Sequence, residues 1–212
     1  MIGVGNGRCV VLASGSPRRR ELLSLLLASF DIKISGVPEP VDTGRSPTEN
    51  VLAIARSKAE AIVPRAASCL VLAADTDVVL DDEILGKPED AAGAVAMLRR
   101  LRGREHEVLT AIVLIDATSE TTWETLVSSR VLIRNLSNTE IDCYVATGEP
   151  LDKAGGYAIQ GAGVSMVRRV DGCYTNVVGL PICATRDMLA LAGAAIDPAI
   201  RCVDADGRLC PR

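Results

Sequence analysis

The chain has 212 residues, of which 48% are hydrophobic and 24% charged, and its formal net charge is −4. This composition is typical of a globular protein with a sizeable core and excludes a disordered chain. The negative charge and an aromatic content of only 2% disfavour a nucleic-acid-binding protein, because such a surface needs basic patches and stacking rings. We therefore expect no nucleic-acid partner.

The chain has seven cysteines, an odd number, at irregular spacing, and no C-x-x-C motif occurs. This pattern predicts neither a disulfide framework nor a zinc site, but small core residues in a reducing cytosol. The N-terminus lacks a signal-peptide pattern, and no apolar run approaches the ~18 residues of a membrane span. We therefore expect a cytoplasmic protein without a membrane partner.

In chain order, apolar patterns with the period of strands alternate with patterns of helical period. Capping boxes at Ser46–Glu49 and Ser137–Glu140 mark two helix starts. We expect strands over residues 8–13, 31–35, 70–80, 105–115, 121–133 and 164–170, helices over 17–30, 46–63, 88–101, 137–147 and 181–192, and loops over 148–163 and 174–179.

The first strand leads into a turn of small residues and a helix that Ser16 caps and Pro17 opens. Such a helix N-terminus favours an anion, because its N–H groups and dipole are positive. Arg18 and Arg19 lie in that first turn and oppose the dipole, a conflict that a bound anion would resolve. The alternative is that both arginines simply lie along the surface.

A buried strand over 70–74 delivers two carboxylates, Asp75 and Asp77, which point to one side because side chains alternate along a strand. Lys87 follows in a stiff loop between Gly86 and Pro88. Acids at a strand end and a fixed cation suit a metal-assisted reaction on phosphate. The alternative is a buried strand that ends in a solvated hairpin turn.

Several other catalytic motifs are absent. The one histidine, His106, lies in a charged run, no serine has a G-x-S-x-G context, and Gly86-Lys87 lacks the rest of a P-loop. The remaining candidates for catalysis are carboxylates and cationic side chains, and the carboxylate oxygens suit Mg²⁺ or Mn²⁺ as ligands. The set comprises Glu39, Asp75, Asp77, Arg18, Arg19, Lys58 and Lys87.

With these residues in view, the chain resembles the Maf family of nucleoside triphosphate pyrophosphatases. The matching blocks are L-A-S-G-S-P-R-R-R-E-L-L (12–23), S-K-A (57–59), A-D-T (74–76), I-L-G-K-P (84–88), G-R-E-H-E-V-L-T (103–110), G-E-P-L-D-K-A-G-G-Y-A-I-Q-G (148–161) and N-V-V-G-L-P (176–181). The resemblance implies the α/β fold of Maf and ITPase-like proteins, with a mixed central sheet, flanking helices and a cleft between two lobes. It also implies one domain over 8–196, with flexible termini at 1–7 and 197–212.

The resemblance further implies a metal-dependent hydrolase that splits a nucleoside triphosphate into monophosphate and pyrophosphate. Asp75 would be its general base and Glu39 an acid near the metal, and Ser14, Ser16, Arg18, Arg19, Lys58 and Lys87 would bind phosphate. The run S-P-R-R resembles the dTTP/UTP branch, in which Arg18, Thr76 and Gln160 match positions of substrate choice. The Gln160 amide can pair with O4 and N3–H of a pyrimidine, although it could instead satisfy loop backbone groups.

Two positions depart from the family pattern: Pro38 replaces an acid beside Glu39, and Asp77 replaces an apolar residue after Asp75. We expect Asp77 to face the cleft and join Glu39 and Asp75 at the metal, since same-side positions are roughly 7 Å apart. The alternative is a bulge that leaves Asp77 solvated.

The leading hypothesis is a house-cleaning pyrophosphatase for dTTP, UTP and modified pyrimidine nucleotides. The alternative is a nucleotide-binding regulator of cell division and septum formation, which would bind the nucleotide without turnover. A homodimer is an assembly that the sequence allows but does not establish.

Overall fold

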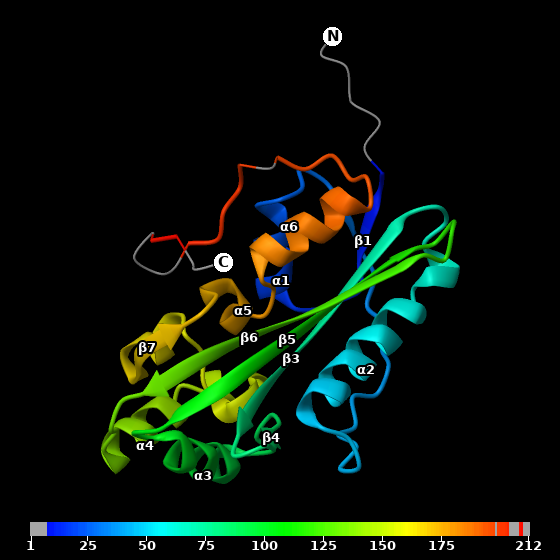
Figure 1. Cartoon of the computed structure of the whole chain (residues 1–212). Coiled ribbons are helices and arrows are strands. Elements are labelled where there is room, and N and C mark those ends of the chain that lie inside the picture. The colour runs from blue at the N-terminus through cyan, green and yellow to red at the C-terminus, as the bar shows by residue number, and fades with distance from the viewer. Residues whose placement is uncertain (1–7, 198, 204–207, 210–212) are drawn as a thin grey trace.

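The computed structural model describes residues 8–197, 199–203 and 208–209. Its strands are β1 (Val10–Leu12), β2 (Asp31–Ile32), β3 (Leu70–Leu80), β4 (Glu83–Leu85), β5 (Glu105–Asp116), β6 (Thr122–Ile133) and β7 (Val167–Asp171). Within the described residues they form one sheet in the order β2-β1-β3-β5-β6-β7, with β4 paired to β3 (Figure 1). β1 runs parallel to β2 and β3, whereas the other pairs are antiparallel. This mixed sheet confirms the predicted fold class.

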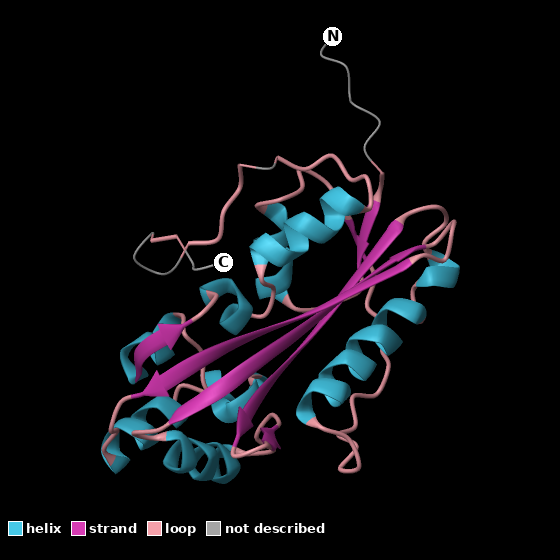
Figure 2. Ribbon diagram, in the orientation of Figure 1, coloured by secondary structure: helices cyan, strands magenta, loops and turns pink. Residues whose placement is uncertain are grey.

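Three of the helices, which Figure 2 shows in cyan, begin where the sequence places their caps. Ser16, Ser46 and Ser137 each accept the backbone N–H of the third residue that follows, and both predicted capping boxes form. The α-helices are α1 (Pro17–Ser24), α2 (Pro47–Glu60), α3 (Ala91–Leu101), α4 (Asn138–Val145), α5 (Tyr174–Val178) and α6 (Ile182–Leu191). The short 3-10 helices are η1 (Val63–Arg65), η2 (Glu149–Asp152), η3 (Ala154–Gly156) and η4 (Gly161–Met166).

The sheet is covered on both faces, and the alternation of β3 decides which residues meet which helix. Leu72 and Ala74 join a core cluster that includes residues of α1, α3 and α6. Val71 and Ala73 join a second cluster with Val51 and other residues of α2. Figure 1 shows α2 on one side of the long strands and α1, α5 and α6 on the other. Odd-numbered side chains of β3 therefore face α2.

Several elements differ from the sequence-based expectation. β2 is shorter than expected, and η4 takes up residues 164–166, where a strand was expected to begin. α1 ends at Ser24, six residues early; of the leucines after it, Leu26 and Leu27 are buried outside any helix and Leu25 is exposed. α5 forms where a loop was expected, because buried Asn176 donates to the carbonyl of Val108 and anchors the segment against β5. β4 turns back on β3 and forms a hairpin that the sequence marked only as a turn. Tertiary contacts override local propensity at these places.

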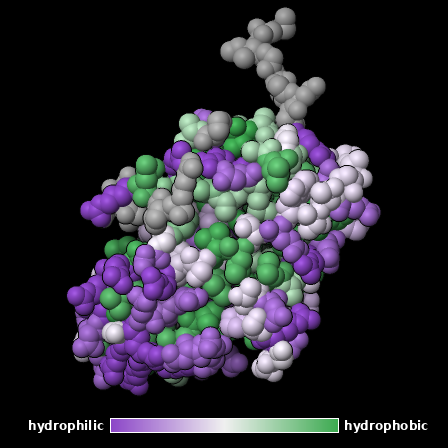
Figure 3. Space-filling view, viewed as in Figure 1, coloured by the Kyte–Doolittle hydropathy of each residue, from purple (hydrophilic) through white to green (hydrophobic). Residues whose placement is uncertain are grey.

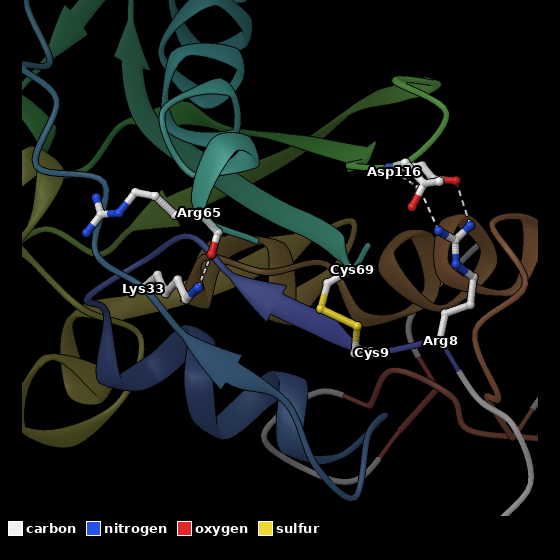
Figure 4. The surroundings of a disulfide bond; sticks show 7 residues. Arg8, Cys9, Lys33, Arg65, Cys69 and Asp116 are labelled. Carbon is white, nitrogen blue, oxygen red and sulfur yellow. Dashed lines mark hydrogen bonds and ion pairs between the residues drawn. A yellow bond between two sulfur atoms is a disulfide. The ribbon is translucent and has the colours of Figure 1, made fainter. Parts of the chain in front are cut away.

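Cys9 and Cys69 form a disulfide, a pair that the expected pattern of small core cysteines in a reducing cytosol did not include (Figure 4). The cause is sheet register. Val10 pairs with Leu70 in the parallel β1–β3 ladder, which places the preceding cysteines side by side with Cα atoms 4.8 Å apart. A sequence separation of 60 residues gives no hint of this neighbourhood. Of the other described cysteines, Cys202 is buried as expected, Cys173 and Cys183 are partly buried, and Cys143 is exposed, against the expectation.

The expected N-terminal flexible segment, 1–7, lies outside the described residues, as do 198, 204–207 and 210–212 of the expected C-terminal tail. The described part of that tail packs on the protein, because Arg186 donates to the carbonyl of Ile200 and Cys202 is only 2% exposed. No helix in the described ranges has the length and apolarity that a membrane span requires. Figure 3 shows hydrophobic residues in the middle of one face, bordered at the lower left by a hydrophilic area over α3 and α4.

Candidate active site

A cleft of about 720 Å³ opens beside the middle of β3. Its place follows from the strand lengths: β1 stops at Leu12, opposite Leu72, so the edge of β3 beyond Leu72 has no β1 neighbour until β4 pairs at Val78. Ten of the eleven residues that the sequence analysis selected line this cleft. They are Ser14, Ser16, Arg18, Arg19, Glu39, Lys58, Asp75, Thr76, Lys87 and Gln160.

Lys58 of α2 joins two carboxylates across the cleft. Its Nζ lies 2.7 Å from Asp75 Oδ1 and 2.7 Å from Glu39 Oε1. The Lys58 and Asp75 side chains are only 7% and 8% exposed, whereas Glu39 is 45% exposed. Burial raises the pKa of Glu39, but the hydrogen bond and charge of Lys58 outweigh it, so the net pKa lies below the usual value. Asp75 is therefore a carboxylate fixed on a rigid strand by a buried cation.

Arg19 is the second fixed cation of the cleft. Its Nε donates to the Gly179 carbonyl at 2.9 Å, its Nη1 to Ser14 Oγ at 3.3 Å and its Nη2 to Thr76 Oγ1 at 3.1 Å. Burial lowers the pKa of Arg19, and the nearby negative charges oppose that shift. The alternative of a surface-lying side chain is therefore wrong for Arg19.

The turn before α1 is organised by its two serines. Ser14 Oγ accepts the N–H of Ser16 at 3.2 Å, and Ser16 Oγ accepts the N–H of Arg19 at 3.4 Å. Ser14 is 8% exposed, so its hydroxyl lies at the wall of the cleft beside the start of α1. This arrangement gives the predicted anion-binding geometry of a strand, a small-residue turn and a helix N-terminus.

Asp77 shares the α2 side of β3 with Asp75 but does not line the cleft, so the expectation that it faces the cleft is wrong. The reason is that the β3–β5 ladder is continuous here and carries Asp77 roughly 7 Å further along the strand. Its Oδ2 is buried without a hydrogen-bond partner, and burial together with the charge of Asp75 raises the pKa of Asp77 to about 7.

Among residues 8–197, 199–203 and 208–209, no group of three or more His, Cys, Asp or Glu side chains is arranged to hold a metal. The predicted triad of Glu39, Asp75 and Asp77 is thus not assembled as a cage, and the Lys58 ammonium bridges Glu39 and Asp75. Mg²⁺ commonly uses one or two carboxylates together with substrate phosphates and waters. The carboxylates of Glu39 and Asp75 fit that donor chemistry.

Gln160 is exposed at the cleft and is carried by a loop whose backbone is fixed on both sides. Tyr144 Oη accepts the N–H of Ala158 at 3.2 Å, and Glu149 Oε2 accepts the N–H of Ala162 at 3.2 Å. Glu149 also lines the cleft and was not predicted as a site residue, although it lies inside the 148–161 block. The expectation that Gln160 only satisfies backbone groups has no support, since Tyr144 and Glu149 do so.

The one histidine lies behind the cleft wall. His106 Nε2 is 2.5 Å from Tyr157 Oη, and Tyr157 lines the cleft. His106 is 3% exposed, and burial lowers the pKa of its imidazole to about 4. It is therefore neutral near pH 7 and supports Tyr157, a residue that the sequence analysis did not select.

Comparisons with known proteins agree with this site. The sequence profile of the family described as "Maf-like protein" matches residues 9–192. A protein of Pelotomaculum thermopropionicum named dTTP/UTP pyrophosphatase is 45% identical over 184 residues, which are 87% of this chain and 96% of that protein. A protein of the same name from Anaeromyxobacter dehalogenans is 50% identical over 186 residues, which are 87% of this chain and 94% of that protein. Another from Salmonella typhimurium is 48% identical over 189 residues, which are 88% of this chain and 94% of that protein. The chain therefore belongs to the Maf family.

Proposed function

We propose that this protein is a nucleoside triphosphate pyrophosphatase that hydrolyses dTTP and UTP, with modified pyrimidine nucleotides, to the monophosphate and pyrophosphate. The observation that carries the proposal is the buried Asp75 carboxylate, fixed by Lys58 at the wall of a cleft that Arg18, Arg19 and Lys87 also line. The similarity to proteins named dTTP/UTP pyrophosphatase supports the same reaction.

The charge of the cleft matches a triphosphate. A nucleoside triphosphate carries about four negative charges, and Arg18, Arg19, Lys58 and Lys87 all line the cleft. The serines of the turn before α1 would bind phosphate oxygens at the helix N-terminus. Because Arg19 and Lys58 are held in place before substrate arrives, they would stabilise the charge that develops as the anhydride breaks.

Asp75 would act as the general base. Water attacks at the α–β anhydride, its proton passes to the Asp75 carboxylate, and pyrophosphate leaves. Lys58 holds Asp75 in one orientation through the 2.7 Å contact. A bound Mg²⁺ or Mn²⁺ would neutralise phosphate oxygens, with Glu39 and Asp75 as its protein ligands.

Base choice would depend on Gln160, with Arg18 as a further determinant. Gln160 is exposed at the cleft on a fixed loop, and its amide offers one acceptor and a donor group. Those groups complement N3–H and O4 of uracil and thymine. Cytoplasmic location and a homodimer stay predictions from the sequence.

A pyrophosphate-release screen over canonical and modified nucleoside triphosphates, with Mg²⁺ and with Mn²⁺, tests the proposal. We expect dTTP and UTP to give the highest kcat/KM. Preference for ATP or GTP would overturn the base assignment but leave the reaction class standing. Nucleotide binding without pyrophosphate release would instead support the alternative of a cell-division regulator.

A further inference from the structure

Behind Arg19 lies a chain of buried hydroxyl groups that the proposed reaction does not yet use. Arg19 Nη2 donates to Thr76 Oγ1, and Thr76 Oγ1 lies 2.9 Å from Thr110 Oγ1. Thr110 Oγ1 donates in turn to the Asn176 carbonyl at 3.1 Å. Thr110 and Asn176 are both 0% exposed, so water does not compete for the bond between them.

The direction of every hydrogen in this chain follows from counting donors. A carbonyl oxygen only accepts, so Thr110 uses its single hydroxyl hydrogen on Asn176. The Thr76–Thr110 contact therefore needs Thr76 as the donor, and this uses the single hydrogen of Thr76. Thr76 can then only accept from Arg19, which is the direction in which the guanidinium donates.

This chain of hydrogen bonds returns to Arg19 through the end of α5 and so forms a ring. The Asn176 carbonyl also accepts the Gly179 N–H at 2.9 Å, and the Gly179 carbonyl accepts Arg19 Nε at 2.9 Å. Gly179 has φ of +120°, a conformation that L side chains rarely adopt. Thr110 is thus connected to Arg19 along both arms of the ring, through Thr76 and through Gly179.

We propose that Thr110 is a positioning residue for Arg19, acting through Thr76, and that Thr76 influences the reaction by orienting Arg19 rather than by donating a hydrogen bond to the nucleotide. The inference rests on the proposed pyrophosphatase function. Three of the five guanidinium N–H groups are donated to Gly179, Ser14 and Thr76, which leaves two to meet phosphate oxygens. The ring fixes the plane in which those two donors lie.

This assignment separates two roles that Thr76 could have. If Thr76 touched the base, its substitution would change the ratio of kcat/KM values between pyrimidine substrates. If it orients Arg19, substitution lowers kcat/KM for every triphosphate in the same proportion. Thr110 is completely buried, so any effect that it has must pass through other residues.

The first test compares Thr110→Val, Thr110→Ser and Thr76→Val with Thr185→Val as the matched control. Thr185 is also 0% exposed and donates to a backbone carbonyl, that of Pro181, but it has no contact with the ring. Because small misplacement of a charged group can cost up to ~10²-fold, we expect Thr110→Val to lower kcat/KM about 10- to 100-fold, mainly in kcat. Thr110→Ser should recover most of the activity, and Thr185→Val should lower only the melting temperature.

Two further kinetic results are required. The Thr76→Val/Thr110→Val double variant should be no more impaired than Thr76→Val alone, because both changes act on one group. The ratio of kcat/KM for dTTP to that for CTP should be unchanged in each variant. Wild-type kcat/KM in Thr110→Val, additive losses in the double variant, or a changed base ratio in Thr76→Val would each overturn the proposal.

The second test does not depend on turnover. In protein labelled with ¹⁵N-arginine, the Arg19 Nε–H signal is identified by its loss in Arg19→Lys, and its hydrogen exchange with water is measured. We expect exchange at least about tenfold faster in Thr110→Val, restored in Thr110→Ser and unchanged in Thr185→Val. Unchanged exchange in Thr110→Val would overturn the proposal. Should the wild-type protein release no pyrophosphate, the proposed function fails while this exchange experiment still decides the role of Thr110.

Discussion

Two regions along β3 place carboxylates next to cations, but one pairs its charges within the chain and the other leaves charged groups for a ligand. Near Leu70, where β3 begins, Asp116 of β5 accepts hydrogen bonds from both terminal nitrogens of Arg8 at 2.6 and 2.5 Å (Figure 4). It also accepts the N–H of Thr118 and the hydroxyl of Ser119. These bonds, above all the one from Arg8, hold the pKa of Asp116 well below its usual range.

In the middle of β3, by contrast, the charged side chains are not fully paired with one another. Asp75 and Glu39 share the single ammonium of Lys58, and Asp77 keeps a buried oxygen without a partner. Cations line the cleft in excess of what its carboxylates pair with directly. A region that serves the fold satisfies its charges within the chain, whereas a region that serves a ligand leaves groups for the ligand to meet.

Matched substitutions in the two regions should give the largest contrast. Asp75→Asn removes the proposed base, so we expect kcat for dTTP to fall ~10²–10⁴-fold with the fold intact. Asp116→Asn should keep kcat within about twofold and lower the free energy of unfolding by about 2 kcal/mol, because charge-assisted hydrogen bonds are lost. Steady-state kinetics and urea unfolding measure both. Near-wild-type turnover in Asp75→Asn would contradict the assignment.

Because Cys9 is next to Arg8 in the chain, the Cys9–Cys69 disulfide tests how much the region around Asp116 contributes to stability. It closes a loop of 60 residues, for which loop-closure entropy gives about 4 kcal/mol of stabilisation. The Cys9→Ser/Cys69→Ser double variant should therefore unfold at lower urea concentration than the oxidised wild type, with unchanged kcat. Wild type treated with a reducing agent serves as the control and should match the variant. Equal stability of oxidised and reduced protein would show that this bond does not hold the region.

Asp77 should give a pH dependence of stability opposite in sign to that of Asp116. Its pKa is raised from 3.8 to about 7 in the folded protein, so between those values the native state keeps a proton that the unfolded chain has released. The contribution of Asp77 is thus fully present below about pH 4 and is lost as the pH rises through 7.

In metal-free protein, Asp77→Asn should be about 3 kcal/mol more stable relative to wild type at pH 7.5 than at pH 4.5. Unfolding by guanidinium chloride with a chelator present measures the difference at both pH values. An equal difference at the two pH values would show that Asp77 is ionised throughout. A metal role for Asp77 further requires that Asp77→Val raise the Mg²⁺ concentration for half-maximal activity.

Gln160 should give the smallest effect, and it should be confined to base choice. Gln160→Ala removes a donor and an acceptor that the proposed base contact uses, so kcat/KM for dTTP should fall about tenfold relative to that for ATP. Stability should stay unchanged, because the side chain is exposed. A loss shared equally by all nucleotides would contradict a contact with the base.

The sequence was most informative where function and local pattern coincide. The strand through Asp75, the serine-capped turn before α1 and the cations around them could all be identified from order and residue type, and they line one cleft. These features are local, or belong to motifs that keep their order along the chain.

What escaped prediction depends on register between distant segments. The disulfide needs the parallel pairing of Val10 with Leu70, and the ring around Arg19 needs Thr110 of β5 next to Thr76 of β3. Alternation along the strand places Asp77 on the correct side of β3 but does not give its distance from the cleft. That distance depends on the continuous β3–β5 ladder. No property of a single segment contains this information.

Product analysis of dTTP hydrolysis tests the central claim most directly. Wild-type protein and Asp75→Asn are incubated with dTTP and Mg²⁺, and the products are followed by ³¹P NMR. The account predicts equal amounts of dTMP and pyrophosphate from the wild type, without dTDP, and almost none from Asp75→Asn. Formation of dTDP with inorganic phosphate, or turnover by Asp75→Asn at the wild-type rate, would contradict it.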